Sequence, residues 1–283
     1  MPDQPPDPFR IHDGLAVYRF GDSGDPVLLM PGPHRFHRPG LQSADALIDG
    51  LVALGRQVIT FDPPESGAST RPASLSMEEM HDCATESLGV CGVSDPVDVV
   101  GHSMGGLVTL AFTLEHPARV ARLVLVGTGA GGPSYMDAPG ALWNRSHPAF
   151  WRLAVLGTVH LVWPRLATER HLNNFVARHS FVDQRFVETE SVELRDWIRP
   201  KEGRAEWHRI ARALDYSPRL GEISVPTLVL CGTHDPQFPP TASKQLAEGI
   251  TDSRLVFFEQ SGHYPFIEEP DAFWAEVARF LAE

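Results

Sequence analysis

The chain reads Val97-Asp98-Val99-Val100-Gly101-His102-Ser103-Met104-Gly105-Gly106 and continues with the apolar run Leu107–Leu114. A β-type run, a glycine-rich turn and a helix-forming run predict a strand, a sharp turn and a helix, with Ser103 at the turn. Gly101 and Gly105 remove the Cβ atoms that would collide across such a turn. The Ser103 hydroxyl would then stand above the sheet at the helix N-terminus, where negative charge is stabilised. The alternative is that Ser103 only caps the helix.

Length and composition limit the classes of protein that this chain can represent. It has 283 residues, of which 42% are hydrophobic, and a formal net charge of −12. This length buries a core in one domain and leaves residues for an insertion. The negative charge argues against nucleic acid as a partner, because phosphates bind Lys and Arg. We therefore expect a small-molecule substrate, and the oligomeric state stays open.

The cysteines and the N-terminus carry no targeting or metal signal. Cys83, Cys91 and Cys231 lie in apolar runs, without the spacing of a metal site or of a disulfide framework. We expect neither a metal nor a cofactor. Residues 1–8 are rich in proline and lack the basic and apolar regions of a signal peptide. No apolar run is long enough to span a membrane, so we expect a cytoplasmic protein that does not bind membranes.

Strand-type and helix-type segments alternate on both sides of the Ser103 turn. After a hairpin at 9–20, the predicted strands are 27–30, 57–62, 97–102, 122–127, 225–231 and 254–259. The other predicted helices are 43–54, 76–91 (with a capping box of Ser76 and Glu79), 240–249 and 270–281. This alternation predicts an α/β fold with a mostly parallel central sheet covered by helices on both faces.

The alternation stops after Gly132 and resumes near residue 219. The intervening block lacks strand signals, and its pattern predicts three or four helices, at 149–163, 168–179, 184–198 and 202–214. A helical block between two strands of one sheet predicts an inserted cap. We therefore expect a core formed by residues 1–132 and 219–283, and a helical cap at 133–218.

Two loops that follow predicted strands supply partners for the serine. Asp235 follows the strand 225–231, and His263 follows the strand 254–259. The carboxyl ends of parallel strands meet at one edge of a sheet, so we expect both side chains near Ser103. The order serine, acid, histidine is the one this topology uses for a catalytic triad. Each residue also has an alternative interpretation. Asp235 would be an ordinary turn aspartate before a proline, and His263 would be a loop histidine that binds the backbone. The neighbouring His234 is a competing candidate for the base.

At these residues the chain resembles the α/β-hydrolase fold family over nearly its whole length. The resemblance is carried by Gly-His-Ser-Met-Gly-Gly at 101–106, Gly-Thr-His-Asp at 232–235 and Ser-Gly-His-Tyr-Pro at 261–265. The ending Phe266-Ile267-Glu268-Glu269-Pro270 and the helical insertion are most similar to the proline iminopeptidase branch. The resemblance implies that Ser103 is the nucleophile, His263 the general base and then acid, and Asp235 the orienting carboxylate.

The resemblance also implies an oxyanion hole of two backbone N–H groups. The N–H group of Met104, which follows the nucleophile, is the first. In the family the second follows a His-Gly pair, but here that segment is Pro31-Gly32-Pro33, and proline has no N–H group. Three alternatives follow. Either the loop shifts so that the His34 N–H group or a side chain takes this place, or the substrate is reactive enough to need only one donor, or acyl transfer is not the physiological reaction. The turn also reads Gly-His-Ser-Met-Gly, where the proline iminopeptidase branch has Gly-Gly-Ser-Trp-Gly.

Aromatic and acidic side chains in and near the insertion are candidates for substrate recognition. The aromatic residues either form the core of the cap or line an apolar pocket for the substrate. The candidates for the pocket are Trp143, Phe150, Trp151, Phe238 and Tyr264. The acidic residues either form a solvated helix face or bind a substrate ammonium group: Asp183, Glu188, Glu190, Glu193, Asp196, Glu202 and Glu206.

The sequence therefore predicts a serine hydrolase that cleaves an ester or a small amide through an acyl-enzyme. Two alternatives stay open. One is an aminopeptidase of the proline iminopeptidase type. The other is a ligand-binding protein on a hydrolase fold with little turnover.

Overall fold

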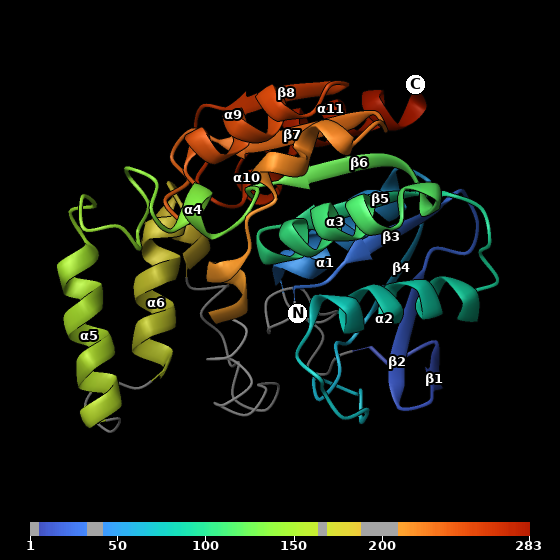
Figure 1. Ribbon diagram of the computed structural model, residues 1–283, viewed down its shortest axis with the longest axis horizontal. Helices are drawn as coiled ribbons and strands as arrows, with labels where there is room; N and C mark the ends of the chain where they lie inside the picture. The colour runs from blue at the N-terminus through green and yellow to red at the C-terminus, as the bar shows by residue number, and fades with distance from the viewer. Residues whose placement is uncertain (1–5, 33–41, 164–168, 188–208) are drawn as a thin grey trace.

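The computed structural model describes residues 6–32, 42–163, 169–187 and 209–283. One eight-stranded sheet forms its centre, in the order β1-β2-β4-β3-β5-β6-β7-β8 (Figure 1). The strands are β1 (Arg10–His12), β2 (Leu15–Phe20), β3 (Pro26–Met30), β4 (Gln57–Phe61), β5 (Val97–His102), β6 (Val120–Val126), β7 (Thr227–Gly232) and β8 (Ser253–Phe258). Only the β1–β2 and β2–β4 pairs are antiparallel, so the predicted α/β fold with a mostly parallel sheet is confirmed.

Helices cover both faces of this sheet. They are α1 (Gln42–Ala53), α2 (Met77–Val90), α3 (Met104–Glu115), α9 (Pro240–Gly249), α10 (Pro265–Glu268) and α11 (Pro270–Ala282), with short 3₁₀ helices η1 (Pro117–Arg119) and η3 (Ser217–Glu222). Alternate residues of one strand reach opposite layers. Val27 and Leu29 of β3 pack in the cluster that includes α1 and α11, whereas Leu28 and Met30 pack in the cluster that includes α2 and α3. Burial on both faces explains why the parallel strands are continuous apolar runs.

Local signals determine where several elements begin. Asp13 and Gly14 have positive φ angles of 44° and 78° between β1 and β2, as the predicted hairpin turn requires. Ser76 caps α2 because its hydroxyl accepts a hydrogen bond from the N–H of Glu79 at 3.1 Å. The carboxylate of Glu79 does not complete a capping box with Ser76. It binds the N–H groups of Ser74 and Leu75 instead.

The described elements between β6 and β7 are helical. They are α4 (Gly132–Tyr135), α5 (Phe150–Val162), α6 (Glu169–Ser180) and η2 (Gln184–Phe186), followed by residues 209–213 and η3. The predicted helices at 149–163 and 168–179 correspond to α5 and α6. Of the other two, only 184–187 and 209–214 are described, and the rest lies outside the described residues. The sequence pattern missed α4, because its glycine and proline are typical of a turn.

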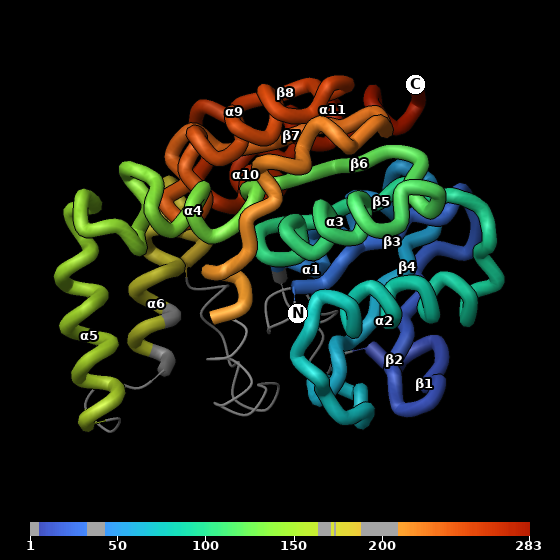
Figure 2. The backbone as a smooth tube through the Cα atoms, viewed as in Figure 1, coloured from blue at the N-terminus to red at the C-terminus, as the bar shows by residue number. Residues whose placement is uncertain are grey.

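The two ends of this inserted segment meet. The N–H of Gly132 donates to the carbonyl of Leu214 at 2.8 Å, and the N–H of Tyr216 donates to the carbonyl of Ala130 at 2.6 Å. A Cβ atom at Gly131 would lie 2.2 Å from the Leu214 carbonyl oxygen, so only glycine allows this approach. Figure 2 shows the orange chain returning beside α4. The division at residues 133 and 218 stays a prediction.

Candidate active site

Ser103 forms the turn between β5 and α3. Its backbone angles are φ 56° and ψ −125°, a strained conformation for a residue other than glycine. Its N–H donates to the Val126 carbonyl of β6 at 2.9 Å, and its own carbonyl accepts a hydrogen bond from the Thr128 hydroxyl at 2.8 Å. The side chain forms no capping hydrogen bond with α3. The hydroxyl therefore does not serve as a helix cap, which was the alternative to a nucleophile.

Two glycines allow this turn to close. A Cβ atom at Gly101 would lie 2.2 Å from the Thr109 hydroxyl and 2.7 Å from the Gly105 carbonyl oxygen. A Cβ atom at Gly105 would lie 2.5 Å from the carbonyl oxygen of Met30, the last residue of β3. Because these neighbours are largely backbone atoms, a larger residue would displace the turn.

Asp235 and His263 form a buried hydrogen-bonded pair. The Nδ1 atom of His263 lies 2.8 Å from Oδ2 of Asp235. The other oxygen of Asp235, Oδ1, accepts hydrogen bonds from the N–H groups of Gln237 and Phe238 at 2.8 and 3.0 Å. Both oxygens of the carboxylate are thus held in place. An imidazole with its Nδ1 proton on this carboxylate has Nε2 free to accept a proton.

The pair lies at the sheet edge where Ser103 is found. A Cβ atom at Gly127, directly after β6, would lie 3.1 Å from Asp235 Oδ2 and 3.3 Å from His263 Nδ1. His102, next to Ser103, packs its ring against that of His263, with 4.5 Å between ring centroids. Its Nε2 atom lies 2.8 Å from the carbonyl oxygen of His263. No pattern in the sequence predicts this contact of His102, because it joins residues 161 positions apart.

The predicted oxyanion residues are described only in part. Met104 is the first residue of α3. The first N–H groups of a helix have no acceptor within the helix, and the N–H of Met104 is one of them. His34 lies outside the described residues.

The aromatic candidates differ in where they lie. Phe238 is 2% exposed and its ring stacks on that of Tyr135 (4.4 Å between centroids) and, more distantly, on His263 (6.0 Å). Tyr264 is buried and stacks on Phe181 at 4.5 Å. These two predicted residues therefore lie beside the Asp235–His263 pair.

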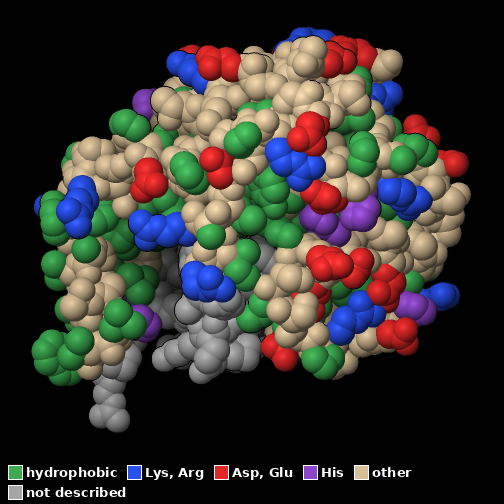
Figure 3. All heavy atoms as spheres, in the orientation of Figure 1, with side chains coloured by type: hydrophobic (Ala, Val, Ile, Leu, Met, Phe, Trp, Pro, Cys, Tyr) green, Lys and Arg blue, Asp and Glu red, His purple; other side chains and the backbone are tan. Residues whose placement is uncertain are grey.

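The other three predicted aromatic residues belong to the inserted segment. Trp143 and Phe150 are half-buried, whereas Trp151 is 62% exposed and packs edge-on against Phe150. Trp151 lies on α5, which stands beyond α6 from the sheet (Figure 1). Hydrophobic side chains gather over α5 at the left edge of the molecule (Figure 3). Most of the Trp151 side chain is thus exposed, and its expected role in lining a pocket with Phe238 stays a prediction.

The remaining polar candidates separate in a similar way. The competing base His234 is exposed. Asp183 forms an ion pair with Arg185 at 2.5 Å on the surface. The other acidic candidates, at 188–206, lie outside the described residues. In the described part of the chain, no group of three or more His, Cys, Asp or Glu is arranged to hold a metal ion. No helix in that part is long and apolar enough to cross a membrane.

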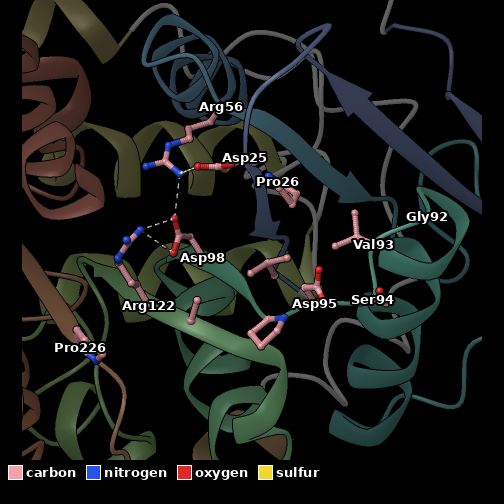
Figure 4. Close-up of a pocket in the computed structure, with 13 residues that line it drawn as sticks. Asp25, Pro26, Arg56, Gly92, Val93, Ser94, Asp95, Asp98, Arg122 and Pro226 are labelled. Carbon is pink, nitrogen blue, oxygen red and sulfur yellow. Dashed lines mark hydrogen bonds and ion pairs between the residues drawn. The ribbon is translucent and has the colours of Figure 1, made fainter. Parts of the chain in front are cut away.

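A cavity of about 580 Å³ lies at the opposite edge of the sheet, where the strands begin (Figure 4). Asp98 of β5 is 5% exposed there and forms ion pairs with Arg56 at 3.2 Å and Arg122 at 3.1 Å. Both guanidinium groups also donate to the carbonyl of Leu281 at the end of α11. These contacts tie β5, β6 and the residue before β4 to the C-terminal helix, and we assign them to stability.

Comparisons with known proteins agree with this fold. The sequence matches the family described as "alpha/beta hydrolase fold" over residues 32–270. It is 32% identical to a 2-hydroxy-6-oxononadienedioate/2-hydroxy-6-oxononatrienedioate hydrolase of Klebsiella pneumoniae, covering 96% of this chain and 91% of that protein. An alpha/beta fold family hydrolase from Bacillus anthracis superposes with a TM-score of 0.79 at 21% identity, covering 94% and 95% of the two chains.

An esterase from Thermogutta terrifontis superposes with a TM-score of 0.68 at 25% identity, covering 95% of this chain and 93% of the other. The comparisons do not single out the proline iminopeptidase branch. The name of the Klebsiella relative denotes an enzyme, which argues against a binding protein without turnover. The chain belongs to the alpha/beta hydrolase fold family and is a hydrolase.

Proposed function

We propose that the protein hydrolyses a carboxylic ester or small amide through an acyl-enzyme on Ser103. The observation that carries this proposal is the buried Asp235–His263 pair beside a strained serine turn whose hydroxyl does not cap the helix. A serine hydroxyl is a weak nucleophile at neutral pH, so it needs such a base. The ester assignment is supported by the likeness to the Thermogutta esterase.

The reaction has two halves. Ser103 Oγ attacks the substrate carbonyl carbon while His263 Nε2 takes its proton, and the N–H of Met104 stabilises the oxyanion. The imidazolium then protonates the leaving group, which departs and leaves the acyl group on Ser103. In the second half, His263 takes a proton from water as the water attacks the acyl-enzyme, and it returns that proton to Ser103. Asp235 fixes the Nδ1–H tautomer throughout.

The Ser103 hydroxyl forms no hydrogen bond with His263 among the contacts of the described residues. Catalytic hydrogen bonds are often long in unliganded enzymes and tighten when substrate binds. In this mechanism, the contact between Oγ and Nε2 forms as the substrate displaces solvent from the turn.

Labelling with a fluorophosphonate probe tests the nucleophile. We expect the wild-type protein to be labelled at Ser103, and we expect Ser103→Ala to abolish both the label and the hydrolysis of p-nitrophenyl esters. Labelling that persists in Ser103→Ala would refute the assignment. A screen across acyl chain lengths and prolyl naphthylamide then distinguishes an esterase from an iminopeptidase.

A second candidate is hydrolysis of a carbon–carbon bond next to a ketone. The relative from Klebsiella is named for 2-hydroxy-6-oxo dienedioates, which contain no ester or amide, and it matches 96% of this chain. Hydrolysis of such a compound must cleave a carbon–carbon bond, and water supplies the hydroxyl and the proton. Loss of the absorbance of the conjugated dienedioate in the presence of the enzyme, without turnover of any ester, would favour this candidate.

A further inference from the structure

The carboxylate of Glu268 in α10 joins two parts of the chain that are far apart in sequence. Its Oε1 atom accepts hydrogen bonds from the N–H groups of Val182 and Asp183 at 2.7 and 2.9 Å. Its Oε2 atom accepts one from the N–H of Gly262 at 2.7 Å. One oxygen thus holds the segment after α6, and the other holds the residue before His263.

The Glu268 carboxylate thus accepts three hydrogen bonds from backbone N–H groups, an arrangement that a charged carboxylate fits well. Burial raises the pKa of Glu268, and the three N–H groups act in the opposite direction by stabilising the charged form. A hydrogen bond to a charged acceptor is roughly twice as strong as one between neutral groups. A glutamine has only one acceptor oxygen and two N–H donors, so it cannot bind all three N–H groups.

The same two segments are in contact at the backbone. The N–H of His263 donates to the carbonyl of Ser180, the last residue of α6, at 2.7 Å. A Cβ atom at Gly262 would lie 2.1 Å from that carbonyl oxygen, so only glycine permits the approach. The rings of Phe181 and Tyr264 stack beside these contacts. The position of the His263 backbone therefore depends on the end of α6.

We propose that Glu268 is a positioning residue, whose carboxylate couples docking of residues 180–183 to the orientation of His263. The proposal rests on the role of His263 as the base in the proposed function. When the carboxylate is lost, the N–H groups of residues 182 and 183 lose their acceptor. The hydrogen bond from the His263 N–H to the Ser180 carbonyl is then weakened, because residue 180 is no longer fixed by the residues that follow it. The imidazole then samples orientations that do not face Ser103. Misplacement of a catalytic group by about 1 Å can cost on the order of a hundredfold in rate.

Glu269 supplies a matched control. Its carboxylate binds the same loop, through the N–H of Gln260 at 2.9 Å and the hydroxyl of Ser261 at 2.5 Å. Its described hydrogen bonds do not reach residues 180–183. Glu269→Gln therefore perturbs the histidine loop without cutting the link to α6, whereas Glu268→Gln cuts the link.

The experiment compares both variants with wild type by steady-state kinetics on p-nitrophenyl esters and by amide hydrogen exchange. For Glu268→Gln we expect kcat to fall about tenfold or more. We also expect faster exchange at Val182, Asp183 and Gly262. For Glu269→Gln we expect a smaller fall in kcat and unchanged exchange at 182 and 183. A kcat for Glu268→Gln within threefold of wild type, or an equal loss in both variants, would overturn the proposal.

A second pair of variants changes the donor of one of these hydrogen bonds and leaves the acceptor residue Glu268 unchanged. Asp183 has φ −86°, close to the angle that proline fixes, so Asp183→Pro replaces one donor N–H by a ring carbon and breaks that hydrogen bond without changing residue 268. Asp183→Ala removes the side chain and keeps the N–H. We expect Asp183→Pro, but not Asp183→Ala, to reproduce the loss in kcat. Equal activities for these two variants would contradict the proposal even if Glu268→Gln failed to fold.

Different results would refute the proposed function and the proposed role of Glu268. Absence of fluorophosphonate labelling at Ser103 in the wild-type protein would refute the function. The exchange rates at Val182, Asp183 and Gly262 still measure the link in that case, because they do not depend on turnover.

Discussion

Oδ2 of Asp235 lies 2.8 Å from Nδ1 of His263, and both side chains are almost completely buried, with 0% and 2% of their surface exposed. The second oxygen of the carboxylate is held by two backbone N–H groups. The carboxylate therefore cannot rotate away from the ring without breaking further hydrogen bonds. This arrangement selects one tautomer of the histidine.

Asp235→Asn tests that tautomer. The asparagine amide either donates a hydrogen bond to Nδ1 or offers a weaker, neutral acceptor, and the first arrangement places the proton on Nε2. We expect kcat for ester hydrolysis to fall by about four orders of magnitude with little change in fold. Steady-state kinetics, with circular dichroism as the check on folding, measure the effect. A loss smaller than tenfold would show that His263 does not depend on this carboxylate.

Asp98→Ala tests the ion-pair cluster at the opposite edge of the sheet. The substitution leaves Arg56 and Arg122, whose side chains are only 13% and 28% exposed, without their shared carboxylate. We expect the free energy of unfolding in urea to fall by about 3 to 5 kcal/mol.

Asp25→Ala is the control for that substitution. Asp25 contacts the same Arg56 at 3.4 Å, but its side chain is 88% exposed. We expect little change in stability, because exposed ion pairs contribute little. Equal effects of the two substitutions would contradict a special role for burial of Asp98.

His81→Phe tests a buried histidine far from the turn. Burial first, and the neighbouring His116 second, lower the pKa of His81 from 6.5 to about 4. Below pH 6.5 the unfolded chain binds a proton at this residue that the folded protein does not bind, so stability is lost as pH falls toward 4. Between pH 7 and pH 5 we expect wild type to lose about 2 kcal/mol more than His81→Phe.

Urea unfolding at several pH values provides this measurement. Between pH 8.5 and pH 7.5 His81 is neutral in both states, so the stability difference between wild type and His81→Phe should stay constant there. A constant difference down to pH 5 would refute the low pKa.

The burial of the three cysteines determines how fast their thiols should be labelled. Burial raises the pKa of Cys83 and Cys231 to about 12, so little reactive thiolate forms at pH 8. Cys91 is only partly buried. With a chromogenic disulfide reagent we expect three thiols to react in denaturant and at most one, Cys91, to react rapidly in the folded protein. Fast labelling that persists in Cys91→Ser would contradict this assignment.

Much of the fold follows from local signals in the sequence. The apolar runs and their turn residues predicted the parallel strands, and the cap at Ser76 predicted the start of α2. The glycines around Ser103 predicted the sharp turn, because their need for space is a property of the backbone at that point. The helix at 132–135 was missed, because its residues are equally suited to a turn.

The sequence by itself determined how strands and helices alternate along the core of the chain. It also named Ser103, Asp235 and His263, since strand ends in a parallel sheet share one edge. Only the tertiary structure decided that Glu268 bridges Gly262 to residues 182 and 183, and that His102 contacts the carbonyl of His263. Local patterns describe the backbone near each residue. Contacts across 80 or more positions depend instead on how the packed elements meet, and no local pattern contains that information.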